Sequence, residues 1–161
     1  SRGYRVGECL RADFFAMDES RQFDVVYSNG FIEHFTNWEE VLRKHARMVK
    51  PNGMLFIAVP NFTGAFQNWF HRVFDRANYD RHHLSAMDPL KWQSVLGDEF
   101  ETVACEYFAE FGFWVGDDKK NLARKLGFWT LRAMLPILRL LPKNRKAWSP
   151  YCGWVARKRV D

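Results

Sequence analysis

Residues 23–61 carry the strongest fold signal in the chain. They read FDVVYSNGFIEHF over positions 23–35 and VKPNGMLFIAVPN over positions 49–61, with a helical pattern between the two segments. Each segment contains a run of β-branched and aromatic residues, as expected for a strand that is covered on both faces. A strand, a helix and a second parallel strand make a βαβ unit, and its crossover is right-handed in nearly every known case. The sequence therefore predicts an α/β fold with a parallel pair of strands.

The predicted helix has start and stop signals between these strands, which we expect over Phe23–Ser28 and Met54–Val59. Asn37 is placed to cap the helix, and Glu40 follows three residues later, close to a capping-box pattern. Pro51-Asn52-Gly53 ends the helix, because proline cannot continue it and glycine tolerates the positive φ of a turn.

The rest of the chain predicts the remaining elements of a mixed sheet. We expect the end of a strand and a turn over residues 9–15, a short helix over Pro89–Leu96, a strand over Phe100–Phe111, a long helix over residues 119–141 interrupted by Pro136, and a final strand over Tyr151–Arg157. No internal repeat or low-complexity segment interrupts this order, so the 161 residues predict one domain.

Composition narrows the class of protein. Hydrophobic residues make up 47% of the chain, which is enough for a packed core. The three cysteines are widely spaced and form no C-x-x-C pair, a pattern typical of reduced thiols in a cytoplasmic protein. No signal-peptide pattern opens the chain, and no apolar run is long enough to span a bilayer.

The formal net charge of +5 is unevenly distributed. Residues 1–118 contain 12 Lys and Arg against 18 Asp and Glu, whereas residues 119–161 contain 12 Lys and Arg against one acid, Asp161. Two interpretations are open: the C-terminal quarter faces an anionic partner, or it is a solvated basic face.

The basic helical region has two interpretations of its own. Lys125, Arg132 and Arg139 recur every seven residues in a segment rich in Leu and Phe that also contains Trp129, as in a helix that lies in a membrane surface. Such a pattern also fits a helix packed on the sheet or on a second subunit, with its basic edge in water. We favour packing and keep peripheral membrane contact through residues 119–146 as the alternative.

The spacing FDxVxxxxxxEH … LxPxGxLxxxxPN resembles the middle of class I S-adenosylmethionine-dependent methyltransferases of the small-molecule type. The resemblance implies a Rossmann-like methyltransferase sheet that is incomplete, holding strands three or four to seven, with a C-terminal antiparallel hairpin and an inserted basic helix. It assigns strands four to seven to Phe23–Ser28, Met54–Val59, Glu101–Glu110 and Tyr151–Arg157. It also divides the single partial domain into a cofactor-side half (9–61), a variable acceptor or lid region (62–97) and a C-terminal part (98–161).

The glycine-rich loop of that family is missing from these residues. No G-x-G occurs in the sequence, since Gly3 and Gly7 are four residues apart. We therefore expect the chain to be a fragment of a longer enzyme or one half of a complementing pair, with low or no affinity for the cofactor by itself. Strand four would then expose an apolar edge suited to self-association.

The resemblance implies S-adenosylmethionine as cofactor and places its contacts at two points. Asp13 matches the acid that accepts a hydrogen bond from the adenine, and Phe14 matches the neighbour that donates a backbone N–H to the ring; a plain turn aspartate is the alternative for Asp13. Asn29, Gly30 and Phe31 follow strand four, where the family holds the methionine part of the cofactor and where glycine allows close approach.

Histidines supply the candidate catalytic and substrate-binding residues. His34, in the Glu33-His34 pair, is a candidate general base, although local packing is the more common role. His82 and His83 are candidates for binding the acceptor, in a loop that either covers the site or is simply solvated. The spacing of His71, His82 and His83 matches no metal motif, so the sequence predicts no metal site.

Together these features predict methyl transfer to a small-molecule acceptor that is anionic or associated with a membrane. The alternative is a degenerate methyltransferase-like subunit or membrane-surface adaptor without catalysis. The nucleic-acid signal is weak, because strand four is not followed by the D/N-P-P-Y/F motif of many enzymes that methylate base amino groups.

Overall fold

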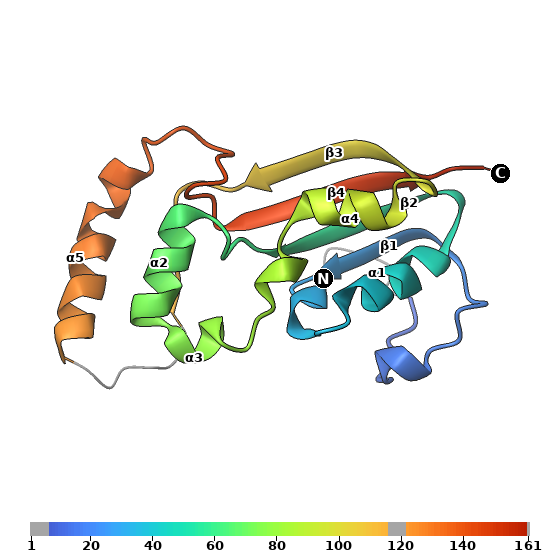
Figure 1. Ribbon diagram of the computed structural model, residues 1–161, viewed down its shortest axis with the longest axis horizontal. Coiled ribbons are helices and arrows are strands. Elements are labelled where there is room, and N and C mark those ends of the chain that lie inside the picture. The colour runs from blue at the N-terminus through green and yellow to red at the C-terminus, as the bar shows by residue number, and fades with distance from the viewer. Residues whose placement is uncertain (1–6, 116–121, 161) are drawn as a thin grey trace.

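The computed structural model describes residues 7–115 and 122–160 of the chain. Within them, four strands form one sheet in the order β1-β2-β4-β3 (Figure 1). β1 and β2 pair in parallel, whereas β4 pairs antiparallel with both β2 and β3. The strands are β1 (Phe23–Asn29), β2 (Val49–Pro60), β3 (Phe100–Phe108) and β4 (Tyr151–Lys158).

Helices gather on one face of the sheet and beyond one of its ends. The α-helices are α1 (Trp38–Arg47), α2 (Ala65–Phe74), α3 (Arg76–Tyr79), α4 (Pro89–Leu96) and α5 (Leu122–Leu138), and the 3-10 helices are η1 (Phe14–Ala16), η2 (Ile32–His34) and η3 (Leu84–Ala86). α1 and α4 lie over the sheet, while α2, α3 and α5 lie past the end toward which β1 points (Figure 1).

The predicted α/β architecture and its C-terminal antiparallel pair are confirmed. The core forms where the alternating side chains of β2 and β4 meet α1 and α4. Leu55, Ile57 and Val59 of β2 are at most 2% exposed, and Trp154 and Trp92 fill the space beside them. The helix expected over Pro89–Leu96 has the expected bounds.

The turn between α1 and β2 differs from the prediction. β2 begins at Val49 rather than Met54, and its register against β1 shifts between Phe23 and Val25. The positive φ falls on Asn52 (62°), not on Gly53. Gly53 is required for another reason, because an added Cβ would lie 2.9 Å from the carbonyl oxygen of Asp24.

The capping box expected at Asn37 does not form. The Asn37 side chain makes no capping hydrogen bond, and its backbone carbonyl accepts from the Glu40 N–H instead. The Glu40 carboxylate accepts from Arg47, the last residue of α1, seven positions further on. A competing ion pair on the helix surface therefore uses the side chain that would have closed the box.

Two expectations about the N-terminal third are also wrong. No strand is formed by the described residues 7–15, and the expected turn appears there as the 3-10 helix η1. β1 is not covered on both faces: Val25 is 55% and Tyr27 66% exposed, on the face opposite α1. That open face carries a hollow of about 350 Å³ whose lining includes Tyr27, Phe56 and Phe108.

α5 contains Pro136, as expected, but it does not pack on the sheet. It lies beside α2 (Figure 1), where a Cβ added at Gly127 would be 3.1 Å from the Phe74 ring. The face of α5 turned away from α2 is apolar and exposed, with Leu126 at 70% and Ile137 at 67%. The interpretation that the sheet buries the apolar side of this helix is therefore wrong.

Asn61 holds the end of β2 to the segment that leads into β4. Its fully buried side chain donates from Nδ2 to the carbonyls of Lys146 and Ser149 at 2.8 and 2.9 Å. Its Oδ1 accepts from the Thr63 hydroxyl and the Gly64 N–H at 2.8 and 3.1 Å. One amide thus joins two segments that are more than 80 residues apart.

Asn61→Ala should destabilise the fold, because the carbonyls of Lys146 and Ser149 lose the donor that joins them. We expect the free energy of unfolding in urea to fall by about 2–4 kcal/mol. Gln22→Ala is the control: this exposed amide makes one long hydrogen bond to the Arg47 carbonyl, and its loss should cost less than about 0.5 kcal/mol. Equal stability of the two variants would contradict the role of Asn61.

Candidate functional site

The parallel strands β1 and β2 end together at one edge of the sheet. The Gly30 N–H donates to the Ala58 carbonyl at 2.9 Å, which extends the strand pairing by one residue. Gly30 has a φ of +63° and turns the chain into η2. Because L residues rarely adopt this φ, and because no side chain stands at Gly30, the backbone remains open to a ligand at this edge.

An aromatic cluster lies beside Gly30. The Phe14 ring is 5.1 Å from the Phe31 ring and stacks on His45 at 4.5 Å, and Phe35 contacts Phe31 at 4.9 Å. The structure therefore brings Phe14 and Phe31 together, although 17 positions separate them. Planar apolar side chains of this kind suit contact with a ring-bearing ligand.

Asp13 lies at the start of η1 and is exposed. Its Oδ1 accepts from the Phe15 N–H at 3.0 Å, which is the local turn bond considered from the sequence. The bond uses one carboxylate oxygen and orients the group, and an ionised carboxylate has further acceptor capacity. Asn29 is exposed at the end of β1 and lies opposite Ala58 in the strand pairing.

The loop that carries Asp13 is fastened to α1 by Lys44. The Lys44 ammonium is buried and donates to the carbonyls of Phe15 and Met17 at 3.2 and 2.9 Å, and to Glu19 at 3.0 Å. Arg47 also donates to Glu19, and these hydrogen bonds lower the pKa of the Glu19 carboxyl to about 2. The amphipathic pattern of α1 gave no sign that one of its lysines points inward.

Glu33 is the most perturbed acid of the site. Its side chain is 1% exposed, its Oε2 has no hydrogen-bond partner, and burial raises the pKa of its carboxyl to about 7. Oε1 faces Gly30, where an added Cβ would lie 3.6 Å away. A buried carboxylate without a cation beside it is costly, and such groups mark functional sites more often than chance would suggest.

Two histidines adjoin Glu33. His34 is partly exposed, with its Nε2 3.9 Å from Glu33 Oε1, and its ring lies 4.5 Å from the ring of His82. His82 is half-buried, and burial lowers the pKa of its imidazole. The neighbouring His83 is half-buried, and its backbone N–H donates to the Glu33 carbonyl at 2.7 Å.

His71 and Asp75 form a buried pair behind these residues. His71 Nδ1 is 3.3 Å from Asp75 Oδ2, one turn along α2, and the His71 ring packs on Phe62 at 4.0 Å. Burial lowers the pKa of the His71 imidazole to about 4. Since His71 is fully buried, this pair supports the wall of the site and cannot touch an acceptor directly.

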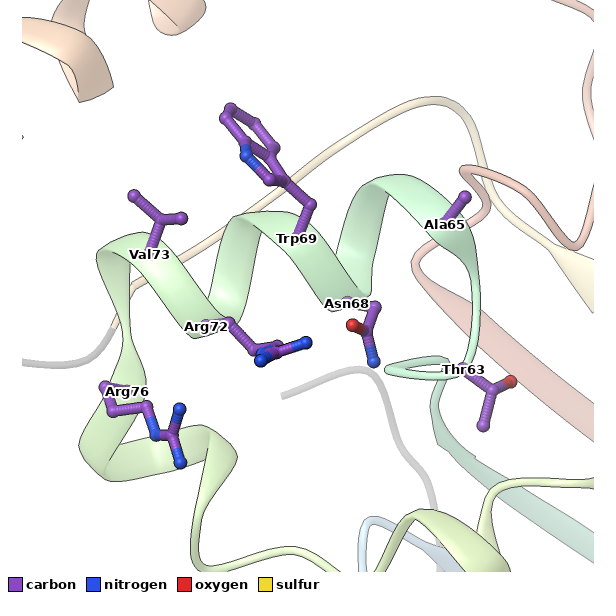
Figure 2. Close-up of a pocket in the computed structure, with 7 residues that line it drawn as sticks. All are labelled: Thr63, Ala65, Asn68, Trp69, Arg72, Val73 and Arg76. Carbon is purple, nitrogen blue, oxygen red and sulfur yellow. The ribbon is translucent and has the colours of Figure 1, made fainter.

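A separate hollow of about 480 Å³ runs along α2 (Figure 2). The side chains of Arg72 and Asn68 extend to one side of α2, and the Trp69 side chain extends to the opposite side (Figure 2). None of the residues predicted as site residues lines this hollow. The sequence-predicted residues instead fall into two adjoining groups: Asp13, Phe14, Asn29, Gly30 and Phe31 around the strand ends, and His34, His82 and His83 around Glu33.

The raised pKa of Glu33 predicts that the stability of the fold depends on pH. Its pKa is raised on folding, so the folded state holds this proton more tightly, and the associated stability is present below about pH 4.5 and lost as the pH rises through about 7. The free energy of unfolding of the wild type, relative to Glu33→Gln, should fall by roughly 2–3 kcal/mol across that range in buffer with a chelator. A difference that does not change with pH would show that Glu33 has an ordinary pKa.

Comparison with known proteins identifies the family to which the chain belongs. A ubiquinone biosynthesis O-methyltransferase from Neisseria meningitidis is 37% identical over 54 residues, which cover 34% of this chain and 23% of that protein. The matched segment is thus well under two thirds of the relative's length.

Solved structures give the same fold at low identity. A SAM-dependent methyltransferase from Archaeoglobus fulgidus superposes with a TM-score of 0.58 at 18% identity, covering 92% of this chain and 66% of that one. A methyltransferase-like protein from Bacillus halodurans superposes with a TM-score of 0.57 at 17% identity, covering 98% of this chain and 74% of that one. A family model for the methyltransferase domain matches residues 7–98, more than half of the chain. The chain therefore belongs to the methyltransferase domain family, with a Rossmann-like sheet that is incomplete in the described residues.

Proposed function

We propose that this chain takes part in S-adenosylmethionine-dependent methyl transfer to a small-molecule acceptor. The observation that carries the proposal is the open backbone at Gly30, with its positive φ at the shared end of two parallel strands. Ligands of open α/β sheets bind beyond the carboxyl ends of the strands. Family membership supports S-adenosylmethionine as that ligand.

The cofactor would lie against the first group of residues. Asp13 would accept from the adenine amino group, the Phe14 N–H would donate to the ring, and Phe31 would cover it. The Asn29 and Gly30 backbone would hold the methionine part. The bound sulfonium supplies the activated methyl group, while these residues bind and orient it.

The acceptor would lie on the side of Glu33. His34 is the candidate general base, because its ring is partly exposed at this end of the sheet. His82 and His83 lie on a loop that is fixed to η2 by the His83–Glu33 backbone bond, which supports their placement beside an acceptor.

A non-catalytic subunit is the second candidate function. It is favoured by one observation: among the described residues β1 pairs only with β2 and is an edge strand of the sheet. Such an edge can pair with another chain, which would complete the cofactor cradle or serve a structural role. Binding of the cofactor by Asp13 distinguishes the two candidates.

Asp13→Ala should weaken the binding of S-adenosylmethionine. Equilibrium dialysis with the methyl-labelled cofactor should give a Kd of about millimolar for the wild type, and the variant should retain at most about a tenth of this affinity. Asp18→Ala is a matched control, since Asp18 also accepts from the N–H two residues on, at 2.9 Å. Equal binding by the two variants would refute the adenine contact.

We further propose that α5 contacts an anionic membrane surface, where an apolar acceptor would be found. The exposed apolar residues of α5 and its extension recur at helical spacing and face away from α2; they are Leu126, Trp129, Met134, Ile137 and Leu140. Lys125, Arg132 and Arg139 follow one edge of this face, and Arg132 lies over the Trp129 ring at 5.8 Å. This arrangement is typical of helices that lie in the membrane interface.

Two further observations bear on this contact. Residues 119–160 contain no Asp or Glu. Among the described residues, the acid that pairs with the cations of this segment is Glu110, which lies 2.9 Å from Lys143 Nζ and 3.9 Å from Arg139 Nε. Among the described helices, none has the length and apolar content needed to cross a bilayer.

Ile137→Asp should release the chain from anionic vesicles. In co-sedimentation, the wild type should bind phosphatidylglycerol-containing vesicles better than pure phosphatidylcholine, and the variant should bind at least about tenfold more weakly. Leu90→Asp is the control, because Leu90 on α4 is also 67% exposed but lies outside the basic face. Equal losses in the two variants would exclude a specific role for α5.

A further inference from the structure

Glu33, His34 and His82 bring three potential metal ligands together. One carboxylate oxygen and one nitrogen from each ring all lie within 4.8 Å of one another. Glu33 and His34 belong to η2, whereas His82 follows α3 almost fifty residues later. The backbone bond from the His83 N–H to the Glu33 carbonyl, at 2.7 Å, fixes the two segments together.

The hydrogen bonding of His82 suits a cation. His82 Nδ1 lies 2.6 Å from the Asn78 carbonyl and must therefore donate to it, which leaves the lone pair on Nε2. A second hydrogen bond that fixes the tautomer in this way is usual for metal-binding histidines.

The burial of Glu33 is a second, independent reason to expect a cation at this cluster. Its carboxyl is almost completely buried, and Oε2 has no hydrogen-bond partner in the described part of the chain. The nearby ion-pairing group is His34, 3.9 Å away, and no Lys or Arg of the described residues pairs with Glu33. A divalent cation at the cluster would offset the charge of this buried carboxylate.

We propose that Glu33, His34 and His82 bind a divalent transition-metal ion, such as Zn²⁺. Two imidazoles and one carboxylate suit zinc, manganese, iron and cobalt better than magnesium or calcium. Glu33 Oε1 and His34 Nε2 are 3.9 Å apart, wider than the roughly 3.4 Å of a tetrahedral site, so the partly exposed His34 ring would have to turn inward on binding. The histidine spacing shows no metal motif because the ligands come from two distant segments.

Three protein ligands leave at least one coordination position open. Water would fill it in the resting site, and an oxygen of the acceptor would replace that water. Coordination would lower the pKa of an acceptor hydroxyl, as it does for bound water, and would take the place of general-base catalysis by His34, whose ring would then be a ligand. This role rests on the proposed methyl transfer, whereas metal binding itself does not depend on it.

The experiment is a titration of the whole 161-residue chain with Co²⁺, followed by visible absorption, and with Zn²⁺, followed by calorimetry. It is done without cofactor in a Cys9→Ser background, since Cys9 is an exposed thiol. We expect one equivalent to bind, with d–d bands of a site with nitrogen and oxygen ligands. Glu33→Gln, His34→Ala and His82→Ala should each weaken binding by at least about tenfold.

His83→Ala is the matched control, because His83 adjoins His82 but its ring is not in the cluster. It should bind the metal like the wild type, and circular dichroism should show all four variants folded. No binding at stoichiometric concentrations, or equal binding by the His82→Ala and His83→Ala variants, would overturn the site. Either result leaves cofactor binding at Asp13 unaffected, so the two proposals fail independently.

Discussion

The parallel pairing of β1 with β2 is the constraint on which the rest of the structure depends. Parallel strands cannot be joined by a tight turn, so the chain crosses over through α1 and returns in the same direction. Both strands therefore end at one edge, where the Gly30–Ala58 hydrogen bond fixes the last step of the pairing. The turn into η2 and the burial of Glu33 both follow from that step.

The sheet is covered unequally, and this explains where the proposed contacts lie. α1 and α4 bury one face and supply the core, whereas the opposite face of β1 exposes Val25 and Tyr27. The apolar side of α5 is likewise directed away from the core. These surfaces and the Glu33 site differ in chemistry: an apolar sheet face, a basic apolar helix, and a buried acid beside two histidines.

The fold could be predicted largely from local pattern, because strand-length apolar runs and a Pro-Asn-Gly turn determine a βαβ unit. The details that depend on distant contacts could not. Asn52 rather than Gly53 takes the positive φ, and Gly53 is needed because an added Cβ would lie 2.9 Å from the Asp24 carbonyl oxygen.

In the candidate site, too, some features could be predicted from local pattern and others depend on distant contacts. Gly30 could be recognised from its place after a strand, and Phe14 and Phe31 from the family pattern. The inward Lys44, the two bonds from Asn61 Nδ2 and the burial that raises the pKa of Glu33 all depend on segments that are remote in sequence. The most direct test of the central claim is to map amide shifts of the ¹⁵N-labelled chain on titration with S-adenosylhomocysteine. The account predicts saturable shifts at Phe14, Asn29, Gly30 and Phe31; shifts confined to the hollow along α2, or none at about millimolar ligand, would contradict it.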